Sequence, residues 1–261
     1  MDLGLAGRRA IVTGASRGIG LATTRRLVSE GVTVIGGSRE TTPELNELVH
    51  GGHVTAVTVD LTSETGPTEL AAAAMAGGPV DILINNAGAV TPRASGFLSV
   101  TDDDWWQALG LTFMTAVRTT RAVLPHMLAR QRGVIVNTAS VNSSLPDPLV
   151  IDYSAAKAAL ASFNKALSKE VGRDGIRVNA VAPGPVSTGL WLGDTGVAAS
   201  VSAATGTKPD EISRAAVRDT ATGRFTTADE VADLITFLAS DRAANITGVD
   251  YIIDGGLIQT V

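Results

Sequence analysis

The chain has 261 residues, of which 44% are hydrophobic, so it is long enough for one or two domains with a large core. Its formal net charge of -5 provides no basic surface for nucleic acid or for an anionic membrane. Cysteine is absent, which excludes disulfides, thiolate catalysis and cysteine-based metal sites. The histidines at 50, 53 and 126 lack zinc-motif spacing, so we predict no metal. With neither a signal peptide nor a bilayer-length apolar run, a cytoplasmic protein is expected.

Short apolar runs alternate with longer helical patterns along the whole chain. The expected strands cover residues 9–13, 32–36, 54–59, 80–85, 134–138, 177–182 and 249–253. Nearly continuous apolar runs are typical of parallel strands covered on both faces. The expected helices cover residues 18–30, 43–49, 64–75, 101–131, 153–172 and 227–239. This alternation predicts a single α/β domain, a doubly wound, Rossmann-like sheet of seven parallel strands with helices on both faces.

A glycine-rich stretch connects the first expected strand to the first expected helix. It reads Thr13-Gly14-Ala15-Ser16-Arg17-Gly18-Ile19-Gly20. Glycines allow a sharp turn that brings backbone N–H groups and a helix amino end against phosphate. The spacing is Gly-x-x-x-Gly-x-Gly, not the common Gly-x-Gly-x-x-Gly, but its place between strand and helix predicts a dinucleotide site.

The end of the second expected strand indicates which dinucleotide is bound. An acid at this place would accept hydrogen bonds from a ribose 2′-hydroxyl and repel a 2′-phosphate. The chain instead has Ser38 and Arg39 there, and Arg17 lies inside the glycine loop. Hydrogen-bond donors and positive charge favour NADP(H) over NAD(H).

Ser140, Tyr153 and Lys157 lie close together in the sequence, between a strand and a helix. Tyr153 and Lys157 are four residues apart, so on a helix they share one face. The ammonium is expected to lower the phenol pKa toward the range where a proton moves at neutral pH. Such a pair is also common on protein surfaces, so the catalytic interpretation depends on the rest of the chain.

Taken together, these motifs resemble those of the short-chain dehydrogenase/reductase family over essentially the whole length, and most of all its single-domain ketoreductases, such as 3-oxoacyl-carrier-protein reductases. The matching pieces, in order, are 13–20, Asp60-Leu61, 85–88 (Asn-Asn-Ala-Gly), Ser140, 153–157 (Tyr-Ser-Ala-Ala-Lys), 179–184 (Asn-Ala-Val-Ala-Pro-Gly) and 254–256 (Asp-Gly-Gly). Each piece is common by itself, but the order and spacing of the set are highly specific.

The resemblance implies a role for each matching residue. Ser140 would hold the substrate oxygen, Tyr153 would act as the acid/base, and Lys157 would bind the nicotinamide ribose and tune Tyr153. The cofactor would also contact Gly14, Ser16, Arg17, Gly18, Ile19, Gly20, Ser38, Arg39, Asp60, Leu61, Asn86, Ala87, Gly88, Pro183, Gly184, Val186 and Thr188. The family is commonly tetrameric through the helices expected at 101–131 and 153–172, so a homotetramer or dimer is expected.

One position departs from the family pattern. Seven residues beyond Trp105, where the family usually has an Asn thought to hold a relay water for the active-site Lys, this chain has Thr112. Its hydroxyl has a shorter reach and in a helix can bond its own backbone instead. We predict that activity survives with an altered proton relay.

Residues 187–225 are rich in small and polar residues and are expected to form a lid over the substrate. Leu190, Trp191 and Leu192 are interpreted either as an apolar pocket wall or as anchors of the lid. The arginines at 130, 132 and 173 offer a weak case for an acidic carrier protein. The identity of the substrate is not encoded in any of these patterns.

The sequence therefore predicts an NADP(H)-dependent oxidoreductase that interconverts a small-molecule ketone and a secondary alcohol, without nucleic-acid or membrane partners. Two alternatives are an NAD(H)-dependent alcohol dehydrogenase of the same family and a nucleotide-binding regulator without catalysis. The intact Ser140, Tyr153 and Lys157 favour an enzyme, since a regulator has no need of them.

Overall fold

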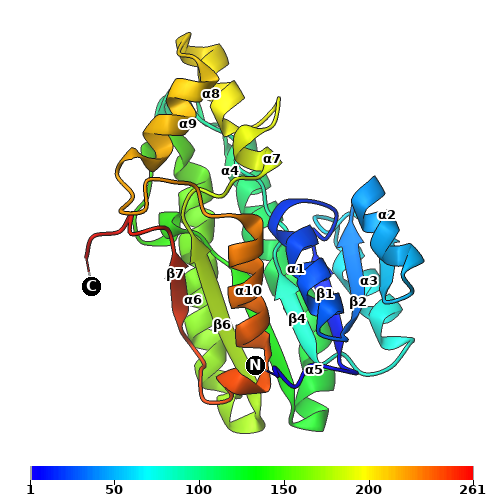
Figure 1. Cartoon of the computed structure of the whole chain (residues 1–261). Coiled ribbons are helices and arrows are strands. Elements are labelled where there is room, and N and C mark those ends of the chain that lie inside the picture. Colours follow the sequence, from blue (N-terminus) through cyan, green and yellow to red (C-terminus); the bar gives the residue numbers. More distant parts are fainter. Residues whose placement is uncertain (1, 261) are drawn as a thin grey trace.

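The structure is a computed structural model that describes residues 2–260. Seven parallel strands form one sheet in the order β3-β2-β1-β4-β5-β6-β7 (Figure 1). The strands are β1 (Arg9–Thr13), β2 (Thr33–Ser38), β3 (Val54–Thr58), β4 (Ile82–Asn85), β5 (Gly133–Thr138), β6 (Ile176–Pro183) and β7 (Asp250–Ile253). All seven predicted strands are confirmed, each end within two residues of its expected place. The predicted doubly wound α/β sheet is therefore confirmed.

Helices cover both faces of the sheet. One face carries α1 (Gly18–Ser29), α2 (Pro43–His50) and α10 (Ala228–Ala239), whose apolar residues share one core cluster. The other carries α3 (Gly66–Met75), α5 (Thr115–Arg130) and α6 (Ile151–Val171). Short 3₁₀ turns occur at Phe97–Ser99, Val141–Ser143, Pro148–Val150, Gly172–Asp174 and Asp241–Ala243. Among residues 2–260, no helix has both the length and the apolar character needed to cross a bilayer.

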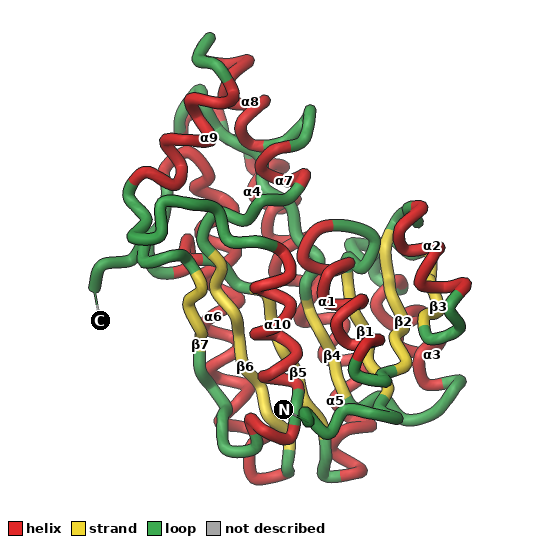
Figure 2. The backbone as a smooth tube through the Cα atoms, viewed as in Figure 1, coloured by secondary structure: helices red, strands yellow, loops and turns green. Residues whose placement is uncertain are grey.

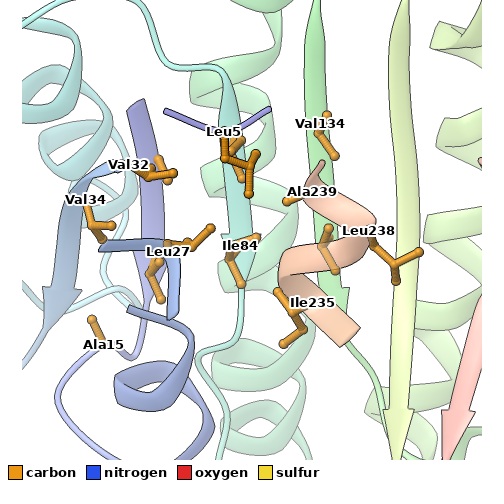
Figure 3. Close-up of a cluster of buried hydrophobic side chains, with 14 of the residues drawn as sticks. Leu5, Ala15, Leu27, Val32, Val34, Ile84, Val134, Ile235, Leu238 and Ala239 are labelled. Atoms are coloured by element: carbon orange, nitrogen blue, oxygen red, sulfur yellow. The ribbon is translucent and has the colours of Figure 1, made fainter. Parts of the chain in front are cut away.

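The core on the α1/α10 face shows how the expected apolar runs are used. Leu27 of α1 and Ile235 of α10 are fully buried and pack toward strand residues such as Ile84 (Figure 3). Burying each such side chain contributes about 1.5 to 3 kcal/mol. Because both sheet faces are covered in this way, the central strands are mainly apolar, although β6 also buries Asn179 in its middle.

The strand order reverses between β1 and β4, which are neighbours in the middle of the sheet. The chain leaves these two strands in opposite directions, so their loops diverge and open a crevice at the carboxyl edge. The tube view shows loops gathered at both edges of the sheet (Figure 2). The motifs predicted from the sequence follow β1, β4, β5 and β6 and therefore lie along this one edge.

The helix expected at 101–131 is interrupted, which corrects the prediction of one continuous helix. It consists of α4 (Asp102–Leu109), a π-helical turn (Gly110–Met114) and α5. The Thr115 hydroxyl donates to the Gly110 carbonyl at 3.2 Å and to the Leu61 carbonyl at 3.1 Å, so side-chain bonds support the wider turn. The π turn buries Thr112.

Three short helices form most of the segment expected to cover the substrate. They are α7 (Gly189–Leu192), α8 (Val197–Thr205) and α9 (Pro209–Arg218), and they project beyond the carboxyl edge (Figure 1). Of their residues only Val197 and Ala198 are buried. The segment is therefore helical but weakly attached to the core.

Candidate active site

The glycine loop between β1 and α1 has the backbone geometry of an anion site. Gly14 and Gly18 have φ angles of +69° and +53°, which favour glycine. A Cβ on Gly20 would lie 2.6 Å from Asn86 Nδ2, so the close approach of the two segments requires glycine there. The first turn of α1 has neither a side-chain cap nor an acid, which leaves its N–H groups open to phosphate.

The loop after β4 is tied to β1 by a small set of hydrogen bonds. The Thr13 hydroxyl accepts from the backbone N–H groups of Asn86 at 2.8 Å and Ala87 at 3.0 Å. Asn86 Nδ2 donates in return to the Thr13 carbonyl at 3.1 Å. These bonds hold the two sides of the crevice together, and Ala87 Cα lies 3.2 Å from the position that a Cβ would take on Gly14.

The residues predicted to choose between the two dinucleotides lie beside the glycine loop. The Thr42 hydroxyl donates to the Ser16 carbonyl at 2.9 Å, which ties the segment after β2 to this loop. Ser38 is buried and donates to the Glu40 carbonyl at 2.8 Å, while Arg39 is exposed. Arg17 lies 3.6 Å from the Glu40 carboxylate, an exposed pairing that competes with any phosphate.

Asp60 and Leu61 follow β3, as predicted for the adenine side. Asp60 Oδ1 accepts from the Thr62 N–H at 2.9 Å and hydroxyl at 2.7 Å. These bonds, and to a smaller extent the Arg39 charge, hold the pKa of Asp60 below its usual range. The carboxylate therefore stays ionised, and Leu61 beside it is buried.

The segment after β6 closes the pocket from the other side. A Cβ on Gly184 would lie 2.9 Å from the Asp254 backbone, so Pro183 and Gly184 pass close to the chain beyond β7. Val186 forms an isolated bridge with Thr226. Thr188 Cγ2 lies 3.5 Å from the position a Cβ would take on Gly18. The predicted nicotinamide border and the predicted phosphate loop are therefore in contact range.

Ser140, Tyr153 and Lys157 converge at the carboxyl edge. Ser140 follows β5 and its Oγ accepts from the Asn142 N–H at 3.2 Å. Lys157 Nζ lies 5.5 Å from the centroid of the Tyr153 ring and donates to the Thr138 carbonyl at 2.5 Å. The backbone of β5 thus directs the ammonium, and the shared face of α6 brings it beside the phenol.

The pKa values of this pair differ from the sequence prediction. Burial raises the pKa of Tyr153 to about 12, and a hydrogen bond with Ser140 acts in the opposite direction. The expected lowering of the phenol pKa is therefore wrong for the chain by itself, because loss of solvation outweighs the hydrogen bond with Ser140. Burial also lowers the pKa of Lys157 to about 8, while the charge of Asp250 acts to raise it.

Arg93, which the sequence patterns did not single out, holds the start of α6. Its guanidinium donates to Asp152 Oδ2 at 3.0 and 2.5 Å and to Asp104 Oδ1 at 2.8 Å. Asp152 is buried and accepts from the Tyr153 N–H at 2.9 Å. The signal that could have identified Arg93 is the buried acid next to the expected phenol, but burial cannot be determined from a sequence pattern.

Thr112 is buried in the π turn close to Lys157. The position of a Cβ on Gly88 would lie 3.7 Å from Lys157 Nζ and 3.9 Å from Thr112 Oγ1. Among the residues that the structure describes, no hydrogen-bond partner of Thr112 Oγ1 is found. The hydroxyl therefore does not bond its own backbone as considered from the sequence, and it stays available to a ligand or water.

The structure bears on two interpretations left open by the sequence, those of the lid and of the surface arginines. Trp191 packs edge-to-face on Phe225, the last residue of the predicted lid, with ring centroids 5.7 Å apart, which favours a packing role for Trp191. Leu190 and Leu192 are 43% and 50% exposed and remain available for an apolar wall. Arg130 is engaged by Asp81 at 2.7 Å, which weakens the case for a carrier-binding surface.

Fold and site together define a nucleotide-binding α/β chain of the oxidoreductase type, with its polar groups at the switch point of the sheet. The family model for short chain dehydrogenases matches residues 8–194, and the chain belongs to this family. The 3-oxoacyl-[acyl-carrier-protein] reductase of Thermotoga maritima is 33% identical over 97% of this chain and 99% of its own. The 3beta-hydroxysteroid dehydrogenase 1 of Eggerthella lenta is also 33% identical, and the match covers 97% of this chain and 94% of that protein.

Among solved structures, L-sorbose reductase from Gluconobacter frateurii, complexed with NADPH and L-sorbose, is similar with a TM-score of 0.91. It is 32% identical, and the match covers 100% of both chains. The predicted resemblance to the family is thus confirmed. The names of these relatives refer to a carrier-bound acyl chain, a steroid and a sugar, so membership of the family does not define a substrate.

Proposed function

We propose that this protein is an NADP(H)-dependent oxidoreductase that interconverts a ketone and a secondary alcohol, with Tyr153 as the acid/base. The observation that carries the proposal is the convergence of Ser140, Tyr153 and Lys157 next to the glycine loop at the carboxyl edge of the sheet. A pure nucleotide-binding regulator would need the loop but not the three side chains.

The residues present fit a dinucleotide. The loop is closely packed at Gly14 and Gly20, where a Cβ would lie 3.1 and 2.6 Å from Asn86 Nδ2, and the uncapped first turn of α1 follows it directly. Gly14 to Gly20 would hold the pyrophosphate, Asp60 and Leu61 the adenine side, and Pro183 to Thr188 the nicotinamide side. When bound, the nicotinamide supplies or accepts the hydride.

The chain's own groups would handle the oxygen. Negative charge develops on a carbonyl oxygen as hydride reaches its carbon, and donors aimed at that oxygen stabilise the transition state. Ser140 and Tyr153 would donate to it, and Tyr153 would pass its proton to the alkoxide. In the oxidative direction the phenolate would take the proton back.

Lys157 makes this proton transfer feasible. A phenol with a pKa of about 12 is a weak acid, so its anion needs a cation within a few ångströms. Lys157 retains its proton below pH of about 8 and lies on the face of the ring. Its charge would stabilise the phenolate that forms once Tyr153 has given up its proton.

NADP(H) is proposed over NAD(H). Support comes from Ser38 and the exposed Arg39 in place of an acid, and from the NADPH bound to the similar L-sorbose reductase. The pairing of Arg17 with Glu40 is the observation that favours the alternative. A homotetramer or dimer through α5 and α6, and a cytoplasmic location, stay predictions from the sequence. Exposed Ala155 and Ala158 on α6 would allow close helix packing between subunits.

The decisive experiment follows NADPH consumption against a panel of ketones, including keto sugars, 3-oxoacyl thioesters and keto steroids, and the reverse reaction with the matching alcohols. Tyr153→Phe should lower kcat by about 10²- to 10⁴-fold while leaving NADPH binding in place. Turnover that survives this substitution would refute the assigned acid. Cofactor binding without turnover of any ketone or alcohol would favour the regulator.

A separate titration tests the cofactor. Arg39→Ala should weaken NADPH binding about tenfold, since a charge-assisted hydrogen bond is worth about 1.5 to 3 kcal/mol, and should leave NADH binding unchanged. Arg121→Ala, which removes an equally exposed charge from α5, is the matched control. Tighter binding of NADH than of NADPH by the unmodified protein would overturn the preference.

A further inference from the structure

Asp250, at the start of the edge strand β7, lies on the sheet face that is covered by α6, the helix that carries the active-site lysine. The register places Asn85, Asn137, Ala180 and Asp250 in one row across β4, β5, β6 and β7. Residues paired in this way point to the same face of the sheet. Asn137 Nδ2 donates to Asn164 Oδ1 of α6 at 3.0 Å, so the row faces α6, the helix that carries Lys157.

The row has polar side chains toward both ends and one small side chain, that of Ala180, between them. Asn85 Nδ2 donates to Asn137 Oδ1 at 2.9 Å, and Asn164 Nδ2 donates to the Val249 carbonyl at 3.3 Å, one residue from Asp250. Ala180 stands between Asn137 and Asp250 and fills little of the space under α6. Asn164 is two helical turns beyond Lys157 and therefore on the same face of α6.

Three buried oxygens, two in this row and one in the π turn, have no partner within residues 2–260. They are Asn85 Oδ1, Asp250 Oδ1 and Thr112 Oγ1. Leaving a buried polar atom unpaired costs about 1 to 3 kcal/mol, so such atoms are normally bonded to protein or to ordered water. Asp250 as a residue is only partly buried, so its carboxyl group connects the interior under Lys157 with the edge of the sheet.

We propose that Asp250 is the acid partner of Lys157 and returns protons to it, through water, from the solvent beside the edge strand β7. In its ionised form Asp250 would also provide the negative charge that favours the ammonium. This inference rests on the proposed function. Because Thr112 occupies the position of the family's relay Asn, the route through β7 is an alternative path for the same proton.

The proton steps balance without a further reactant. During ketone reduction Tyr153 gives its proton to the alkoxide, and Lys157 then gives a proton to the phenolate. The Asp250 carboxylate then takes a proton from solvent and passes it by way of water to the neutral amine, which restores both the carboxylate and the ammonium. Oxidation of the alcohol runs the same chain in reverse and releases one proton.

Few charged or titratable groups lie around Asp250 and Lys157. Asp250 raises the pKa of Lys157, and Lys157 lowers that of Asp250, which burial sets at about 6. Tyr153 is the other titratable group beside Lys157, whereas Asp152 is paired with Arg93. Asp254, at the end of β7, accepts from the Gly256 and Ile258 N–H groups. Removing the Asp250 charge should therefore lower the pKa of Lys157.

The test compares Asp250→Asn with Asp229→Asn, which removes an exposed charge at the start of α10. With a ketone that the protein reduces, Asp250→Asn should lower kcat at pH 8 about tenfold or more, with little change in NADPH binding. The loss of reduction rate with rising pH should begin at a lower pH. Imidazole in the buffer should restore part of the rate, because a small diffusible acid can replace a lost proton donor.

The double variant Asp250→Asn/Thr112→Asn should recover part of the lost rate by restoring the second path. Asp250→Asn with unchanged kcat and pH profile would overturn the proposal. So would a loss that imidazole does not rescue and that follows the loss of folded protein in thermal unfolding.

A second readout is independent of turnover and separates failure of this inference from failure of the proposed function. In protein with ¹³C-labelled aspartate carboxyls, the signal absent from Asp250→Asn should titrate near pH 6. In Lys157→Met it should titrate at higher pH, because the lysine charge lowers the pKa of Asp250. A midpoint near 4 that Lys157→Met does not move would overturn the pairing even if no substrate is known.

Discussion

The floor of the pocket and its cover differ in how firmly they are held. The floor, formed by the carboxyl end of β5 and the start of α6, is fixed by β5 backbone bonds and by buried side chains such as Lys157 and Asp152. The cover, formed by α7, α8 and α9, buries only Val197 and Ala198 among its helical residues. Chemistry therefore resides on a rigid base, while the part that would contact variable substrate groups is free to adapt.

The largest expected effect is on the floor. Arg93→Ala should lower the free energy of unfolding by about 3 to 5 kcal/mol, because it leaves the Asp152 carboxylate buried without its cation. Urea unfolding of the purified variants measures the loss. Arg224→Ala, which breaks an exposed pair with Glu230, is the control and should cost less than about 1 kcal/mol. Equal losses for both variants would show that the ion pair in the floor is no more stabilising than an exposed one.

The next effect concerns pH. Burial raises the pKa of Asp250 from 3.8 to about 6, so between these values the folded chain holds a proton that the unfolded chain releases. The stability of the unmodified protein relative to Asp250→Asn should therefore fall by about 1 to 3 kcal/mol as pH rises from about 4 to 6, and then level off. Urea unfolding at each pH gives this difference. A flat difference would show that the carboxyl group is solvated.

A smaller effect is expected at the hinge between cover and core. Trp191→Ala removes the edge-to-face contact with Phe225, worth about 0.5 to 1.5 kcal/mol beyond the buried area. We expect KM for the ketone to rise several-fold with little change in NADPH affinity, as determined by steady-state kinetics and fluorescence titration. Phe225→Ala should give the same pattern. A fall in NADPH affinity as large as the rise in KM would place Trp191 with the floor.

The smallest effect is expected at Leu192, which is half exposed. Leu192→Ala should change the free energy of unfolding by less than about 0.5 kcal/mol, as for other surface positions. The KM of this variant for apolar ketones tests whether Leu192 forms part of an apolar pocket wall. It should rise if the side chain contacts the substrate and stay unchanged if the side chain faces solvent. Leu145→Ala, at another exposed leucine, is a control for general surface effects.

The sequence by itself determined the sheet, the family and the positions of the principal side chains. Apolar periodicity located all seven strands, and the motif spacing placed Ser140 and Tyr153 at one edge, since both signals are local in the chain. The same local signals produced an error in the helix expected at 101–131. The helix pattern there is continuous, but a tertiary hydrogen bond from Thr115 to Leu61 and a local one to Gly110 support a π turn.

Only the tertiary structure decided the electrostatics. The raised pKa of Tyr153, the ion pair of Arg93 with Asp152 and the effect of the Asp250 charge on Lys157 all depend on burial and on residues far apart in the sequence. A sequence pattern identifies which groups can ionise. The free energy of ionisation depends on the solvent and charges around each group, and those exist only once the chain has folded.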